Sequence, residues 1–190
     1  NAHWTARETS EWLYRSLVAT PLFLSRCTSY GQRIAVDRIP YIQGNLSIEL
    51  GSDIRISGQI GISGNSRRSP VLKIGNGVFI ASECSFNVAE RIELGDFVSI
   101  GKSTYIADTE GHNHYNPQRP IWEVPAGDGE IAPVVIEDNV QISRDCMILK
   151  GVRIGARSVI GAGSVVRSDI PADSIVMGNP ARVIKKMTAA

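Results

Sequence analysis

Two histidines, His112 and His114, stand two residues apart in a polar segment that also holds Asp108 and Glu110. Histidine accepts a proton near neutral pH more readily than other side chains, so either residue could act as a general base that activates a hydroxyl. The same H-x-H pair could instead supply two ligands to a zinc ion. The third histidine, His3, lies near the first residue and belongs to no comparable cluster.

The composition of the chain restricts the class of protein to which these histidines belong. The chain of 190 residues is 43% hydrophobic, 21% charged and only 6% aromatic, with a net charge of +1. These values suit one globular domain and argue against disorder and against a whole-surface electrostatic grip on nucleic acid. No apolar run approaches the roughly 20 residues of a membrane-spanning helix. Three cysteines without C-x-x-C spacing indicate no disulfide framework, so a cytoplasmic setting is expected.

A six-residue repeat organises most of the chain. Hydrophobic anchors recur in three blocks, Ile74, Ile80 and Phe86, then Leu94, Ile100 and Ile106, then Ile136, Ile142, Ile148, Ile154, Ile160 and Val166. A period of six fits neither a helix nor simple strand alternation, but it fits a short strand followed by a turn. Three such units close a triangular coil, and coils stack as parallel strands about 4.8 Å apart. The positions four residues after each anchor are mostly small or β-branched, so Cys84 and Cys146, which occupy two of them, are expected to pack inside.

The repeat divides the chain into an N-terminal helical segment (1–44), a solenoid (45–183) with a loop excursion (107–134), and a tail (184–190). In the first segment, Thr5 and Glu8 form a capping box, and Pro21 is expected to stop the helix. This helix could cap the open end of the first coil. It could also touch a membrane that carries a lipid-linked substrate, or contact a partner. The residues expected in the membrane contact are Leu22, Phe23 and Leu24, with the basic Arg15, Arg26, Arg33 and Arg38.

The repeat resembles the hexapeptide-repeat acyltransferase family over roughly residues 45 to 183. The resemblance implies an all-β, left-handed parallel β-helix of about six coils that assembles as a homotrimer with active sites between subunits. The segment from Asp108 to His112 is similar to the Asp-Thr-x-x-His pattern of polysaccharide-modifying O-acetyltransferases and to the Gly-His of maltose and galactoside acetyltransferases. By this resemblance His112 is the catalytic base and His114 the second candidate. The imidazole would be oriented by Asp108, Glu110 or Glu130.

The same resemblance implies acetyl-CoA as the co-substrate and no metal. Relatives that bind zinc need a further histidine near residues 143–147, and this sequence has none there. The coenzyme would lie along the later coils, with the I-G-A-G-S stretch among its contacts. The expected coenzyme residues are Ser143, Gly161, Ala162, Ser168 and Arg182, and the expected acceptor residues are Asn87 and Glu90.

The resulting expectation is an acetyl-CoA-dependent O-acetyltransferase acting on a sugar hydroxyl in surface-polysaccharide or lipopolysaccharide biosynthesis. Its partners would be further copies of itself and a sugar or polysaccharide precursor, and not nucleic acid. Two alternatives stay open. The first is N-acetylation of an amino sugar or another amine, which requires a base in the same place. The second is a solenoid that binds or assembles without catalysing a reaction.

Overall fold

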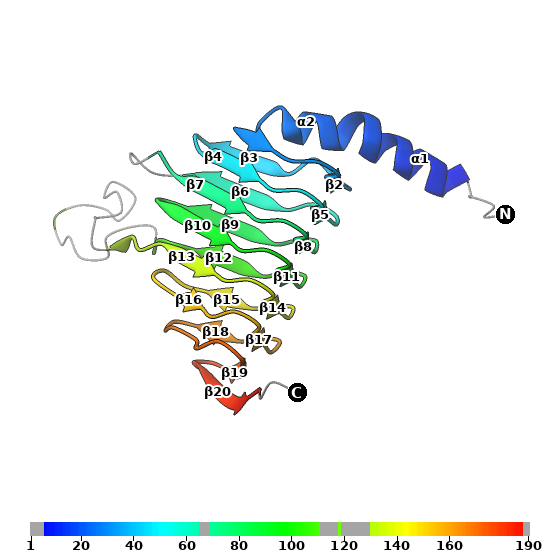
Figure 1. Ribbon diagram of the computed structural model, residues 1–190. Helices are drawn as coiled ribbons and strands as arrows, with labels where there is room; N and C mark the ends of the chain where they lie inside the picture. The colour runs from blue at the N-terminus through cyan, green and yellow to red at the C-terminus, as the bar shows by residue number, and fades with distance from the viewer. Residues whose placement is uncertain (1–5, 65–68, 111–117, 119–129, 188–190) are drawn as a thin grey trace.

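The computed structural model describes residues 6–64, 69–110, 118 and 130–187. Three parallel sheets, here called faces A, B and C, wrap into a triangular prism (Figure 1). Face A contains β1 (Ser29–Tyr30), β4 (Ser47–Leu50), β7 (Val71–Ile74), β10 (Arg91–Leu94), β13 (Val134–Ile136) and β16 (Arg153–Ile154). Face B contains β2 (Ala35–Val36), β5 (Arg55–Ile56), β8 (Phe79–Ile80), β11 (Ser99–Ile100), β14 (Gln141–Ile142), β17 (Val159–Ile160), β19 (Ser174–Gly178) and β20 (Ala181–Lys186). Face C contains β3 (Tyr41–Gly44), β6 (Gly61–Gly64), β9 (Ser85–Val88), β12 (Tyr105–Ala107), β15 (Met147–Ile148) and β18 (Val165–Val166).

Successive triplets of strands form six coils, from coil 1 (β1–β3) to coil 6 (β16–β18). The predicted anchors stack in register inside the prism, as in the row Phe86, Ile106, Ile148 and Val166 on face C. All of the anchors in the three predicted blocks are buried. Cys84 and Cys146 are buried as well, and burial raises the pKa of the Cys84 thiol to about 11. The predicted all-β fold of about six coils is therefore confirmed.

The corner between faces A and B carries a stack of side-chain acceptors that the repeat does not reveal. The Asn76 Oδ1 accepts from the Ser52 backbone N–H at 2.9 Å, and the Asp96 Oδ1 accepts from Asn76 N–H at 2.7 Å. Asp138 continues the stack, because its Oδ1 accepts from Asp96 N–H at 2.8 Å. Each side chain thus satisfies a turn N–H of the preceding coil, which the β-ladders leave without a partner.

The first coil begins earlier than the predicted boundary at residue 45. The strand β1 pairs in parallel with β4, with Tyr30 opposite Leu50, so the solenoid includes residues assigned to the helical segment. Tyr30, Val36 and Ile42 occupy the anchor registers at the expected six-residue spacing. Tyr30 is 55% exposed, so the first position of this coil lacks the buried hydrophobic side chain that marks the later anchors.

The N-terminal helix also continues beyond its predicted end. It consists of α1 (Ala6–Tyr14), a π-helical turn η1 (Arg15–Ala19) and α2 (Thr20–Leu24). The Thr20 N–H donates to the Arg15 carbonyl, so the hydrogen-bonding pattern widens just before Pro21. Pro21 therefore occupies the first turn of α2, where its missing N–H is tolerated, and the helix does not stop there. In the described part of the chain, no helix has the length and apolarity needed to cross a membrane.

Only the second half of this helix packs on the solenoid. Ala19 and Phe23 are buried against the first coil, whereas Trp12, Leu17 and Leu22 remain about half exposed or more. The Thr20 Oγ1 accepts from Val36 N–H at 3.0 Å and fixes the helix to β2. The α1 end projects past the prism (Figure 1). The end of the helix thus packs against coil 1 through Ala19, Thr20 and Phe23, and its role as a cap stays a prediction.

The opposite end of the prism is closed by a hairpin. The strand β19 adds to face B in parallel with β17, and β20 returns antiparallel along β19. The predicted tail from residue 184 therefore begins inside β20, which continues to Lys186. Because β20 runs antiparallel, it ends the stacking of coils on this face.

Candidate functional site

The segment with the two histidines leaves the prism at the corner where face C turns into face A, between β12 of coil 4 and β13 of coil 5 (Figure 1). Its two ends lie side by side as a short antiparallel stem. Thr109 forms a bridge with Ile131, and the Glu110 N–H donates to the Glu130 carbonyl at 3.4 Å. The stem fixes where the segment starts and returns. His112 and His114 themselves lie outside the described residues.

Asp108 anchors the stem to the turn that joins coil 3 to coil 4. Its buried carboxylate accepts from the backbone N–H groups of Ala89, Glu90 and Arg91 at 2.6, 2.7 and 2.6 Å. Its own N–H donates to the Asn87 carbonyl, and its carbonyl accepts from Ala132 N–H. Burial raises the pKa of Asp108, and the three N–H donors oppose this effect. The carboxylate is thus occupied by the backbone, which removes Asp108 from the candidates for orienting an imidazole.

The other two acidic candidates differ in their surroundings. The Glu110 carboxylate is half exposed and forms an ion pair with Lys150, with 3.0 Å between Nζ and Oε1. The Glu130 Oε2 is buried and accepts no hydrogen bond from any residue that the structure describes. A buried carboxylate oxygen requires a donor, because its desolvation is costly. Glu130 therefore retains an open acceptor at the base of the histidine segment.

The two expected acceptor residues lie at the foot of this stem. Asn87 points outward from β9 on face C, and Glu90 follows at the corner where Asp108 binds the backbone. The Ser63 hydroxyl donates to Asn87 Oδ1 at 3.3 Å, and the Asn87 amide donates to the Tyr105 hydroxyl at 3.5 Å. The sequence interpretation missed Ser63 and Tyr105. They stand 24 and 18 residues from Asn87, about one coil away in each direction, so only strand register reveals them.

The expected coenzyme residues divide between two edges of face C. Ser143, Gly161 and Ala162 lie at the corner between faces B and C, on coils 5 and 6. A Cβ on Gly161 would come within 2.5 Å of the Met177 side chain, and Met177 pairs with Arg182 across the terminal hairpin. Ser143, Gly161, Ala162 and Arg182 therefore line the edge between faces B and C, here called the coenzyme edge. Ser168 follows β18 at the opposite corner, between faces C and A, and the fold does not bring it to the others within one chain.

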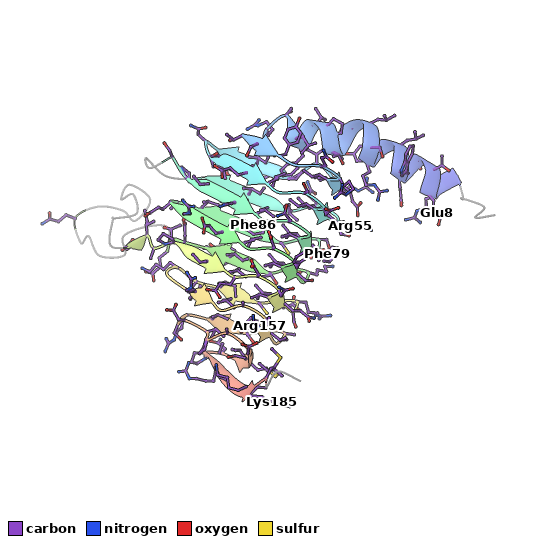
Figure 2. All side chains as sticks on the ribbon, in the orientation of Figure 1. Glu8, Arg55, Phe79, Phe86, Arg157 and Lys185 are labelled. Atoms are coloured by element: carbon purple, nitrogen blue, oxygen red, sulfur yellow. The ribbon has the colours of Figure 1, made fainter. Side chains whose placement is uncertain are left out.

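The histidine stem and the four residues of the coenzyme edge are likewise separated within one chain. Face C stands between them, and a four-residue strand such as β9 spans roughly 13 Å. Face B adjoins the coenzyme edge, and its Arg55 and Phe79 lie on the side of the prism away from β13, where the stem ends (Figure 2). A site that uses both edges would need them to come from different copies of the chain.

Comparison with known proteins identifies the repeat. Residues 133–168 match the family model described as bacterial transferase hexapeptide (six repeats). A 55-residue segment is 47% identical to 2,3,4,5-tetrahydropyridine-2,6-dicarboxylate N-acetyltransferase of Staphylococcus aureus. That segment covers 29% of this chain and spans only about a quarter (23%) of the length of the curated relative.

Solved structures resemble almost the whole chain. A hexapeptide-repeat acetyltransferase of Vibrio cholerae, complexed with acetyl coenzyme A, is 26% identical with a TM-score of 0.62, and the match covers 97% of this chain and 91% of that chain. A variant of AntD, an N-acyltransferase of Bacillus cereus in complex with dTDP-4-amino-4,6-dideoxyglucose and coenzyme A, has a TM-score of 0.74 at 23% identity. That match covers 90% of this chain and 89% of the AntD chain, and it shows a shared fold.

Proposed function

The chain is a hexapeptide-repeat protein by its repeat and its β-helix, and from this premise we propose that it is an acetyl-CoA-dependent acetyltransferase acting on a sugar hydroxyl. The observation that carries the proposal is the anchored histidine segment. The stem of this segment joins the solenoid beside the outward-facing Asn87. The solenoid in turn resembles an acetyltransferase solved with acetyl coenzyme A, in a match that covers 97% of this chain. The setting that suits this activity is the biosynthesis of surface polysaccharide or lipopolysaccharide.

In the proposed reaction, His112 acts as the general base. The imidazole takes the proton of the acceptor hydroxyl while the hydroxyl oxygen attacks the thioester carbonyl carbon. The carbon–sulfur bond then breaks, the acetyl group remains on the acceptor as an ester, and the departing thiolate receives the proton. Asn87 and Glu90 would bind the acceptor at the foot of the stem. Ser143, Gly161, Ala162 and Arg182 would bind the coenzyme of an adjacent copy, and Ser168 would lie apart from them.

The chain would work as a homotrimer with each site shared between neighbours. Support comes from the separation of the histidine stem and the coenzyme edge on opposite sides of face C. Flat prism faces also allow copies to pack side by side and enclose shared clefts.

Acetyl transfer by single variants tests the assignment of the base. We expect His112→Ala to lower kcat by about 10²- to 10⁴-fold, the usual contribution of a general base, and His114→Ala to retain most of the activity. Thiol release from acetyl-CoA with a panel of sugars and nucleotide sugars provides the measurement. Near-normal turnover by His112→Ala, or an equal loss in both variants, would contradict the assignment.

Glu130 is proposed to orient the imidazole through its open, buried oxygen. Glu130→Gln should lower kcat while leaving KM for acetyl-CoA unchanged, because the amide would weaken the hydrogen bond without emptying the site. Glu110→Gln provides the matched control, since the Glu110 carboxylate is half exposed and paired with Lys150. Equal effects of the two substitutions would remove Glu130 from this role.

A second candidate function is N-acetylation of an amino group on the same scaffold. The 47% identity to an N-acetyltransferase over 55 residues favours it. The product distinguishes the two chemistries, because an acetyl ester is removed by mild alkali and an acetyl amide is not. An alkali-stable product with every acceptor tested would replace the O-acetyltransferase proposal by the N-acetyltransferase one.

A further inference from the structure

Face C differs from face A in the chemistry of its outward side chains. Coils 1 to 4 present two rows on face C that run along the prism axis. The first row consists of Tyr41, Gly61, Ser85 and Tyr105, and the second consists of Gln43, Ser63, Asn87 and Ala107, of which Ala107 alone is buried. None of these eight residues carries a charge. Face A, in contrast, presents Lys73 on β7, and Arg91 and Glu93 form an ion pair on β10.

Gly61 is the residue on face C that the fold itself does not explain. In the described part of the chain, every other glycine either adopts a positive φ or would place a Cβ within 3.0 Å of another atom. A Cβ on Gly61 would meet only the Ser85 hydroxyl, at an ordinary contact distance of 3.6 Å. A glycine inside a strand weakens the sheet, and it often marks a place where a ligand approaches the backbone closely.

The neighbours of Gly61 give this open position a consistent chemistry. Ser63, Ser85 and Asn87 provide hydroxyl and amide groups that both donate and accept hydrogen bonds. Tyr41, with 63% of its surface exposed, and Tyr105 stand at the two ends of the first row. Each tyrosine offers an apolar ring with a polar tip. Hydroxyl-rich ligands with apolar ring faces are sugars, and the absence of charge in both rows disfavours an anionic group.

From these observations we propose that face C of coils 1 to 4 binds an acceptor glycan of several sugar units, which extends from Asn87 across Gly61 towards Tyr41. Tyr41 and Tyr105 are three strand spacings apart, roughly 14 Å, which is longer than a single sugar ring. The reacting sugar would lie at the foot of the histidine stem, and the next units would follow the prism axis towards coil 1. The inference rests on the proposed function and specifies its acceptor as an oligosaccharide or polysaccharide.

The test compares two matched valine substitutions in the full-length chain. Gly61→Val fills the open position on face C, and Ser99→Val adds the same β-branched side chain to an outward position on β11 of face B. The probe is an array of neutral oligosaccharides that contain one to six units of the same sugar. The fluorescently labelled chain is applied to the array, and its thermal midpoint and sedimentation are measured in parallel.

We expect the wild-type chain to bind at least one oligosaccharide series about tenfold more tightly at three units than at one. Gly61→Val should remove this gain while its thermal midpoint stays equal or rises, because valine suits a strand better than glycine. Ser99→Val should bind as the wild type does. A purely structural role for Gly61 would instead lower the thermal midpoint.

Three results would overturn the glycan site. They are the absence of any length-dependent binding by the wild type, undiminished binding by Gly61→Val, and a changed sedimentation coefficient of Gly61→Val, which would assign face C to contact between copies. Acetyl transfer to a single sugar separates this inference from the proposed function. If both variants transfer acetyl equally and the affinity on the array does not change with oligosaccharide length, the glycan site alone is refuted. If the wild-type chain transfers no acetyl group but its affinity rises with oligosaccharide length, the proposed acetyltransferase activity alone is refuted.

Discussion

Asp108 shows how a single side chain can position a long excursion from a repetitive fold. Asp108 lies in the stem from which the histidine segment starts, and its carboxylate accepts three backbone N–H groups of the preceding corner. The Asp-Thr-x-x-His pattern therefore contains a positioning residue as well as the proposed base. Its first member fixes the backbone from which the later members extend.

Replacing Asp108 by alanine should be strongly destabilising. The three N–H groups would lose their acceptor at a buried corner, and each unsatisfied group costs about 1–3 kcal/mol, so we expect a loss of at least about 3 kcal/mol in the free energy of unfolding. Urea denaturation followed by circular dichroism measures this loss. Asp53→Ala is the control, because Asp53 is exposed and contacts the exposed Arg33. Equal stability of the two variants would refute the anchoring role.

At the scale of elements, the N-terminal helix is one continuous segment whose two ends have different surroundings. Phe23 in α2 and Ala19 at the end of the π-helical turn are buried against the first coil, while Trp12 in α1 and Leu17 in the middle of the turn remain exposed. The change from exposed to buried side chains thus occurs within the π-helical turn Arg15–Ala19. The membrane contact expected through Leu22, Phe23 and Leu24 is wrong for Phe23, because Phe23 is buried against the first coil and Leu24 packs partly on the same core, so that only Leu22 of the three is exposed.

Neighbouring residues in α2 allow a direct test of the cap. Phe23→Ala should cost about 3–5 kcal/mol, the usual range for a buried phenylalanine, because it opens the interior of coil 1 to water. Leu22→Ala removes a similar apolar side chain that is 50% exposed, so its effect should be small. Chemical denaturation of both variants provides the comparison. Similar losses would mean that the helix does not close the coil.

The sequence alone predicted the strands that follow the six-residue repeat. It did not predict the side-chain contacts between residues that are far apart in the chain. A period of six predicts an inward side chain on each face, so the anchors from Ile74 to Val166 were identified correctly. Asp96 and Asp138 are 42 residues apart, and Ser63 and Asn87 are 24 apart. The insertions between coils vary in length, so only the observed strand register reveals these pairs. The first coil was missed because Tyr30, which is in register with the anchor Leu50, is itself exposed and does not continue the row of buried hydrophobic anchors.

At the scale of the whole molecule, the two edges of face C explain why one chain would be incomplete as an enzyme. The histidine stem stands at the corner between faces C and A, while Ala162 is exposed at the corner between faces B and C. If each site takes its base from one copy and its coenzyme edge from the next, two different inactive variants should restore activity to each other in mixed assemblies.

Co-expression of His112→Ala with Ala162→Trp tests this arrangement. The tryptophan would block the coenzyme edge without disturbing the core, because Ala162 is exposed. In randomly mixed trimers, half of the bases and half of the coenzyme edges are intact. We therefore expect about a quarter of the wild-type acetyl transfer, although each variant alone is nearly inactive. Separately purified variants, mixed at once without subunit exchange, should show no recovery. A co-expressed pair that stays inactive would place both halves of the site in the same chain.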